Sequence, residues 1–85
     1  DEDDVWSYVF NSEERYWIII RDIKNDLLYQ GWLSAFSTTH NENEILLSNV
    51  QVYRNSNTEE VLYNMEKVYF TKKSDDIIIE FRKDN

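Results

Sequence analysis

Acidic side chains are the most abundant groups in this chain that could do chemistry, and several of them are neighbours in the sequence. In Asp75-Asp76 and Glu59-Glu60, one carboxyl could act as an acid and the other as a base if burial separated their pKa values. Adjacent acids in polar turns are usually solvated, and both then stay ionised near neutral pH. These pairs therefore predict surface turns, and they do not indicate a catalytic site.

Other nucleophiles and metal ligands are scarce. His40 is the only imidazole and cysteine is absent, so a zinc site would lack its usual nitrogen and sulfur ligands. A catalytic triad would need Ser37, His40 and a distant acid to converge on one loop. The acidic residues 1–4 lack the spacing and the central glycine of an EF-hand calcium loop. We therefore predict a protein that is not an enzyme and that has no metal and no cofactor.

The charge distribution argues against phosphate ligands. The net charge is −8, from 17 acids and nine bases, and residues 1–14 hold six of these acids and no base. The adjacent basic pairs, at residues 72–73 and 82–83, are each followed closely by acids. Because nucleic-acid binding draws mainly on clustered Lys and Arg, we expect no nucleic-acid partner.

The size and composition predict one small folded domain. The chain has 85 residues, of which 41% are apolar and 15% aromatic, too many for a disordered tail. Its longest aliphatic runs are three residues, at 18–20 and 77–79, far short of the roughly 20 that a membrane span needs. The sequence begins with Asp1 rather than Met, which fits a piece of a larger protein.

The chain divides into an acidic leader and a run of strands. Residues 1–14 are expected to contain a short helix over residues 3–10, because Val5, Tyr8 and Val9 have helical spacing and follow acids. Residues 15–85 are rich in β-branched and aromatic side chains, and they predict strands at residues 15–23, 27–37, 44–53, 61–71 and 76–82. The fold class is therefore mainly β: a short N-terminal helix followed by a five-stranded, strongly bent antiparallel small barrel.

Two backbone features are expected to shape this barrel. Residues 24–26 form a tight hairpin turn, and without a glycine there Asn25 or Asp26 must supply the positive φ. The only glycine, Gly31, lies in the second strand and predicts a bulge, a sharp bend or a close backbone approach. We expect Gly31, Trp32 and Phe36 to be structural residues, the two rings as part of the core.

The alternation of apolar residues also predicts which faces the later strands present. In the third strand, one face should carry Leu46, Val50 and Val52, and the other Ile45, Leu47 and Tyr53. The fourth strand should be irregular around residues 64–67. In the fifth, Ile77, Ile79 and Phe81 should share a face.

The segments WIIIRDI (residues 17–23), ND (25–26) and YQGWLSAFS (29–37) resemble the first motif of the Sm and Sm-like proteins. The order of a helix and five strands is also theirs. The chain is more similar to a group of uncharacterised bacterial domains with the same Sm-like or SH3-like small barrel, in which a run like YQGWL is followed by one like ILLSNV and a Tyr or Phe. This resemblance covers about residues 15–82. It implies a cytoplasmic domain of a membrane-anchored bacterial protein, with the tether outside this sequence.

The RNA site of Sm proteins does not carry over to this chain. Ser37 stands where the motif has an acid, and His40-Asn41 stand where it has Met-Asn. In place of an Arg-Gly pair before the last strand, the chain has residues 74–76, Ser-Asp-Asp, which would repel phosphate. The resemblance therefore implies the barrel and not the RNA chemistry.

Two functions remain open. The favoured hypothesis is a non-enzymatic protein-interaction or assembly module, which binds a protein partner or itself through the edges of the fourth and fifth strands. Tyr and Trp are enriched at protein interfaces, and the candidates here are Trp6, Phe10, Tyr53, Tyr63 and Tyr69. The alternative is an Sm-like oligomeric nucleic-acid-binding protein, which the fold permits and the charge opposes.

Overall fold

The computed structural model describes residues 15–39, 42–72 and 77–83. These residues form one antiparallel sheet of five strands: β1 (Tyr16–Asp22), β2 (Leu27–Thr39), β3 (Glu42–Arg54), β4 (Tyr63–Lys72) and β5 (Ile77–Lys83). The described part of the chain contains no helix, so the mainly β class and the five predicted strands are confirmed. The leader with its expected helix, His40, Asn41 and the turn at residues 73–76 lie outside the described residues.

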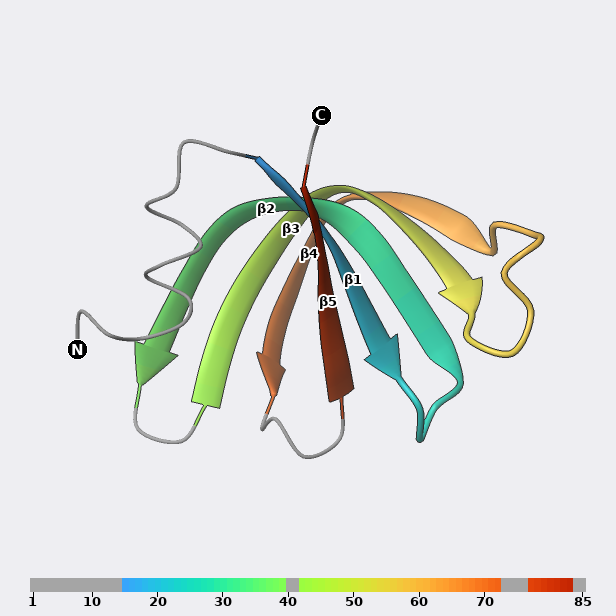
Figure 1. The fold of residues 1–85 in the computed structure, drawn as a ribbon, viewed down its shortest axis with the longest axis horizontal. Helices are drawn as coiled ribbons and strands as arrows, with labels where there is room; N and C mark the ends of the chain where they lie inside the picture. Colours follow the sequence, from blue (N-terminus) through green and yellow to red (C-terminus); the bar gives the residue numbers. More distant parts are fainter. Residues whose placement is uncertain (1–14, 40–41, 73–76, 84–85) are drawn as a thin grey trace.

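The strand order in the sheet is β4-β3-β2-β1-β5 (Figure 1). β4 and β5 are the edge strands, and no ladder joins them to each other among the described residues. Closure of the sheet into a barrel therefore stays a prediction. No helix of the described residues is long and apolar enough to cross a membrane.

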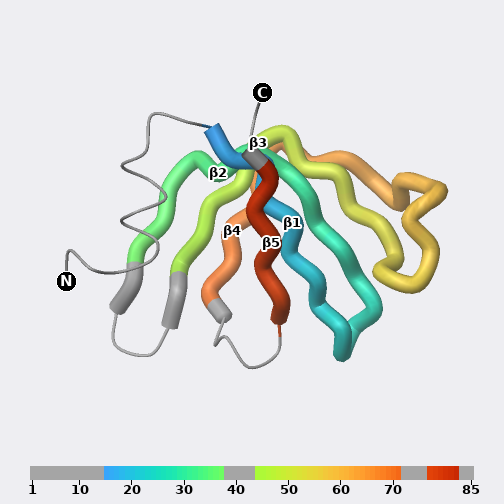
Figure 2. The backbone as a smooth tube through the Cα atoms, in the orientation of Figure 1, coloured from blue at the N-terminus to red at the C-terminus, as the bar shows by residue number. Residues whose placement is uncertain are grey.

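The two longest strands, β2 and β3, have 13 residues each and arch over together (Figures 1 and 2). Their register shifts twice near the middle of β2. Opposite Gly31 of β2, strand β3 has two residues, Asn49 and Val50; further on, Ser34 of β2 is the extra residue, and it restores the original register. Bulges of this kind bend and twist a strand, which accounts for the arch.

Gly31 lies where the backbone of β2 has no room for a side chain beside β3. A Cβ atom on this residue would lie 2.8 Å from the carbonyl oxygen of Ser48 and 3.0 Å from a methyl group of Val50. Gly31 does not have a positive φ. The glycine is therefore required by the close approach of the two backbones and not by an unusual conformation of its own.

The bulge in β3 changes which side chains share a face. Asn49 has a φ of 54°, and beyond it Val50 and Val52 return to the buried side that Ile45 and Leu47 occupy. The prediction that put Val50 and Val52 opposite Ile45 and Leu47 is therefore wrong. The cause is the extra residue, which shifts a two-residue alternation by one position.

The irregularity expected in β4 around residues 64–67 takes a mild form. The β3–β4 ladder keeps one register from Asn43↔Lys72 to Val52↔Tyr63, but it does not pair Glu66 with Asn49, the residue of positive φ in β3. The register shifts themselves lie between β2 and β3.

The core lies on one face of the sheet. Its buried members come from β1, β3 and β4: Ile18, Ile20, Ile45, Leu47, Val50, Val52 and Phe70. Ile77 and Ile79 of β5 pack against this cluster from one face, as predicted, while Phe81 is partly exposed and packs edge-on against Tyr16. The ring of Phe36 also packs against the cluster.

Trp32 does not belong to that core cluster. Its ring packs edge-on against Trp17, with the ring centroids 4.7 Å apart, and Arg15 lies 3.9 Å above it. Trp17 and Trp32 are cross-strand partners on the face opposite the core. The expected core role of Trp32 is corrected accordingly, because its strand position points away from the buried isoleucines of β1.

The predicted hairpin turn after β1 is confirmed. Asp26 has a φ of 55°, the positive value that this glycine-free turn was expected to need. The side chain of Asp26 also reaches the segment after β3: its carboxylate accepts hydrogen bonds from the backbone N–H and the hydroxyl of Ser56, both at 2.8 Å. Its backbone carbonyl accepts a third bond, from Asn55. The turn therefore ties β1 and β2 to the far end of β3.

We expect Asp26→Ala to lower the free energy of unfolding by about 2 kcal/mol. The substitution removes two charge-assisted acceptors and places a Cβ-bearing residue without a compensating hydrogen bond at positive φ. Asp26→Asn is the control, because asparagine tolerates positive φ and keeps one acceptor oxygen; its loss should be less than half as large. Urea unfolding followed by circular dichroism measures both. An Asp26→Ala protein as stable as the wild type would show that the turn is not tied to Ser56.

Candidate interaction surface

The two edge strands carry most of the large exposed apolar side chains. In β4 these are Tyr63, Met65 and Tyr69, and in β5 they are Ile78 and Phe81. Val61 and Leu62 directly precede β4. In residues 15–39, 42–72 and 77–83, every other large hydrophobic side chain except Ile23 is at least partly covered.

The start of β4 is held in place by β3. The backbone N–H of Leu62 donates a hydrogen bond to the carbonyl of Val52 at 2.7 Å, and Tyr63 and Met65 then pair with Val52 and Val50. Because those two valines are buried, the first half of β4 is fixed on a rigid strand while its own side chains are exposed. Glu66 and Lys67 follow on the same edge and keep it from being uniformly apolar.

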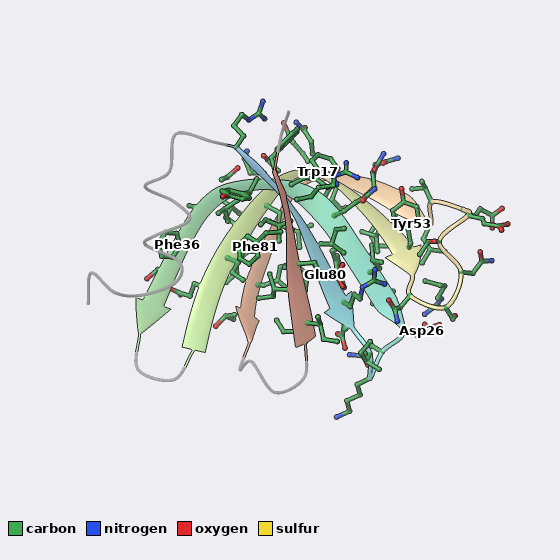
Figure 3. The ribbon with its side chains drawn as sticks, in the orientation of Figure 1. Trp17, Asp26, Phe36, Tyr53, Glu80 and Phe81 are labelled. Atoms are coloured by element: carbon green, nitrogen blue, oxygen red, sulfur yellow. The ribbon has the colours of Figure 1, made fainter. Side chains whose placement is uncertain are left out.

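The β5 edge is fixed by an ion pair on the outer face of the sheet, the face opposite the core. Arg21 of β1 donates to both carboxylate oxygens of Glu80, at 2.9 Å and 3.4 Å, and to the side-chain oxygen of Asn55 at 2.8 Å. Glu80 and Phe81 lie on opposite sides of β5 (Figure 3). The exposed Ile78, opposite Arg21 in the ladder, therefore belongs to the outer face next to this ion pair.

A row of aromatic and amide side chains crosses the outer face and satisfies its own hydrogen bonds. The indole N–H of Trp17 donates to Gln30 at 3.1 Å, and the amide of Gln30 donates to Gln51 at 2.7 Å and to the hydroxyl of Tyr53 at 3.0 Å. The hydroxyl of Tyr53 donates to Gln51 at 3.3 Å. This row stabilises the pairing of three strands, so its polar groups are engaged within the sheet.

The five aromatic interface candidates therefore do not form one patch. Tyr53 is half-buried in the outer row, whereas Tyr63 and Tyr69 are exposed on β4 and are separated by six positions, about 20 Å. Trp6 and Phe10 lie outside the described residues. Along β4, the hydroxyl of Tyr69 donates to the carboxylate of Glu44 at 2.6 Å.

Met65, Leu62 and Ile78 were not among the sequence candidates, although each is exposed at an edge strand. Although the fourth and fifth strands were expected to be edges, the apolar pattern did not show that these three side chains would be left uncovered. The one signal in the sequence was the unbroken run Ile77–Ile79, because a strand with apolar residues on both faces cannot bury both against one core.

The hydroxyl of Tyr29 has a pKa that its surroundings shift. Burial, together with the nearby Tyr63 and Asp22, raises the pKa of the Tyr29 hydroxyl above its ordinary value of 10.0. Tyr29 therefore stays protonated near neutral pH, with its ring packed edge-on against Phe70. Asp22, which is buried, accepts two hydrogen bonds from Asn25. No group of three metal-ligating side chains gathers among the described residues.

One hollow lies between β3 and β4 beside the bulge. It has a volume of about 390 Å³ and is lined by Asn49, Val50, Gln51, Asn64, Met65 and Glu66. No basic side chain lines it, so this hollow does not suit a phosphate group.

Comparison of the chain with protein-family models, with curated proteins and with solved structures found no match. The functional argument therefore depends on the geometry of this surface.

Proposed function

We propose that this domain is a non-enzymatic assembly module that joins protein chains by extending its sheet at β4 and β5. The observation that carries the proposal is the gathering of exposed apolar side chains on the two edge strands. An edge strand offers main-chain hydrogen bonds to a further strand, and exposed apolar side chains along it add buried area when that strand pairs.

The two edges differ from each other, which favours head-to-tail pairing between copies of this chain. β4 and β5 lie at opposite ends of the strand order, so β4 of one copy can pair with β5 of the next. Such a contact leaves one β4 edge and one β5 edge open after each addition, and it produces a ring when the rotation closes. The parts concerned are Tyr63–Lys67 and Ile77–Glu80.

The resemblance to bacterial small-barrel domains supports placing this module in a larger membrane-anchored protein, on the cytoplasmic side, with its tether outside this sequence. The alternative, Sm-like binding of nucleic acid, has weaker support. Of the basic side chains, Arg21 is engaged by Glu80 and Arg15 stacks on Trp32, and the edges carry Glu66 and Glu80. These side chains do not form a positively charged groove of the kind that binds single-stranded nucleic acid.

Light scattering on a sizing column tests the proposal, with the 85-residue chain at several concentrations in low and high salt. We expect a mass above that of the monomer that rises with concentration and persists in high salt, because main-chain and apolar contacts are not screened. Ile78→Lys should weaken association at least about tenfold, since it places a charge on a pairing edge.

Ile23→Lys is the matched control, because Ile23 and Ile78 are exposed to a similar extent, 53% and 50%, and Ile23 lies outside both edge strands. It should leave the mass unchanged. A monomer under every condition, or equal effects of the two substitutions, would contradict assembly through the edges. A titration of the same samples with single-stranded RNA tests the alternative function. Nucleic-acid binding by an Sm-like protein requires an affinity for RNA that falls steeply as salt is added.

A further inference from the structure

A groove opens over the second half of β2, the first half of β3 and the end of β4 that pairs with β3. Its volume is about 230 Å³, and its walls are mostly apolar: Ala35, Phe36, Ile45, Leu46 and Tyr69. The polar members are Ser37 and Glu44, and the carboxylate of Glu44 accepts the hydrogen bond from Tyr69. Small-molecule pockets typically have volumes of roughly 300–1,000 Å³, so this groove better suits one or two apolar side chains.

The course of β1 directs the preceding residues toward this groove. The β1–β2 ladder ends at Trp17↔Trp32, whereas β2 continues to Thr39 with β3 as its one neighbouring strand among the described residues. The guanidinium carbon of Arg15 lies 3.9 Å from the centre of the Trp32 ring, so the chain is still beside β2 just before β1 begins. Arg15 and the start of β1 therefore lie next to the part of β2 that β1 leaves uncovered.

Residues 5–10 are within reach of the groove. Ala35 lies three positions beyond Trp32, about 10 Å along the strand. The five residue steps from Arg15 to residue 10 can span up to about 17 Å when extended, or about 8 Å as a helix. The segment contains five apolar side chains in six positions: Val5, Trp6, Tyr8, Val9 and Phe10. A segment this short cannot bury so much apolar surface against itself.

We propose that the groove binds residues 5–10 of its own chain, with Trp6 and Phe10 in contact with Leu46 and Tyr69. Trp6 and Phe10 are four residues apart, so they share a face of the helix expected over residues 3–10. The two aromatic residues that were candidates for a partner interface then serve an internal contact. The edges of β4 and β5 remain as the surface for other chains.

Nuclear magnetic resonance on the full 85-residue chain tests this contact. We expect nuclear Overhauser effects between the indole protons of Trp6 and the methyl groups of Leu46. They should be absent between chains in a mixed sample of isotope-labelled and unlabelled protein. Leu46→Lys should abolish these effects and speed amide hydrogen exchange in residues 5–10 at least about tenfold, since the segment loses its apolar partner.

Leu62→Lys is the matched control, because it makes the same change at an exposed leucine that lies before β4 and does not line the groove. It should leave both measurements unchanged. Amide exchange at Ile18 and Ile20 shows whether the sheet of each variant stays folded. Three results would overturn the proposal: no contact from Trp6 or Phe10 to the groove, contacts only between different chains, or contacts that survive Leu46→Lys.

Discussion

Gly31→Val should lower the free energy of unfolding by about 4 kcal/mol, a large part of the total for a domain of this size. The new Cβ would lie 2.8 Å from the carbonyl oxygen of Ser48, which is backbone and cannot rotate away. The further methyl groups of valine would add contacts with Val50, which is already only 3.0 Å from the Cβ position. To accommodate these methyl groups, β2 and β3 would have to move apart beside the buried core.

Gly31→Ala is the informative companion, because it tests the sign of the effect. In an ordinary strand, replacing glycine by alanine stabilises a protein by roughly 0.5–1 kcal/mol. At position 31 we expect the opposite, a loss of about 2 kcal/mol, because the same atom meets the Ser48 carbonyl. Urea unfolding of the three proteins measures both values. A gain in stability from alanine would show that the strands are not in close contact at this position.

Ile20→Ala should cost about 3–4 kcal/mol. The side chain of Ile20 is fully buried between Tyr29 of β2 and Ile79 of β5, its cross-strand partners. Its truncation would leave a cavity that two antiparallel ladders prevent from collapsing. The protein would therefore lose the transfer free energy of the removed atoms and would also bear the cost of the cavity.

Ile78→Ala is the control for this prediction, since it removes the same atoms from a side chain that is half exposed on the outer face. It should change the free energy of unfolding by less than about 1 kcal/mol. Both values come from urea unfolding at a concentration at which the protein has a single mass. Equal losses for the two substitutions would mean that the core does not lie on the face that contains Ile20.

The strands were predictable because their signals are local. The apolar run of β1, the polar turn that follows it and a positive φ at Asn25 or Asp26 depend on neighbouring residues, and all three were predicted; the structure places the positive φ at Asp26. Gly31 was also recognised as a point of bending or close approach. The partner that makes this glycine necessary, the Ser48 carbonyl, is 17 positions away and could not be inferred from the sequence.

The faces of β3 and the surroundings of Trp32 were not predictable in this way. Alternation assigns faces correctly only while the two-residue period is unbroken, and Asn49 breaks it. Asn49 is a residue type that tolerates positive φ, but this tolerance alone does not mark it as the inserted residue. Trp32 was assigned to the core on its size, but strand parity places it opposite Trp17 on the outer face.

The sequence by itself determined the class of the fold, the number and approximate bounds of the strands, and the acidic balance that disfavours phosphate ligands. These follow from composition and from the spacing of residues close in the chain. The fourth and fifth strands were expected to be the sheet edges, but only the tertiary structure decided that Met65 and Ile78 are exposed on them while Val50 and Val52 are buried. The physical reason is that exposure depends on the neighbour across the ladder, which is chosen by pairing over the whole sheet.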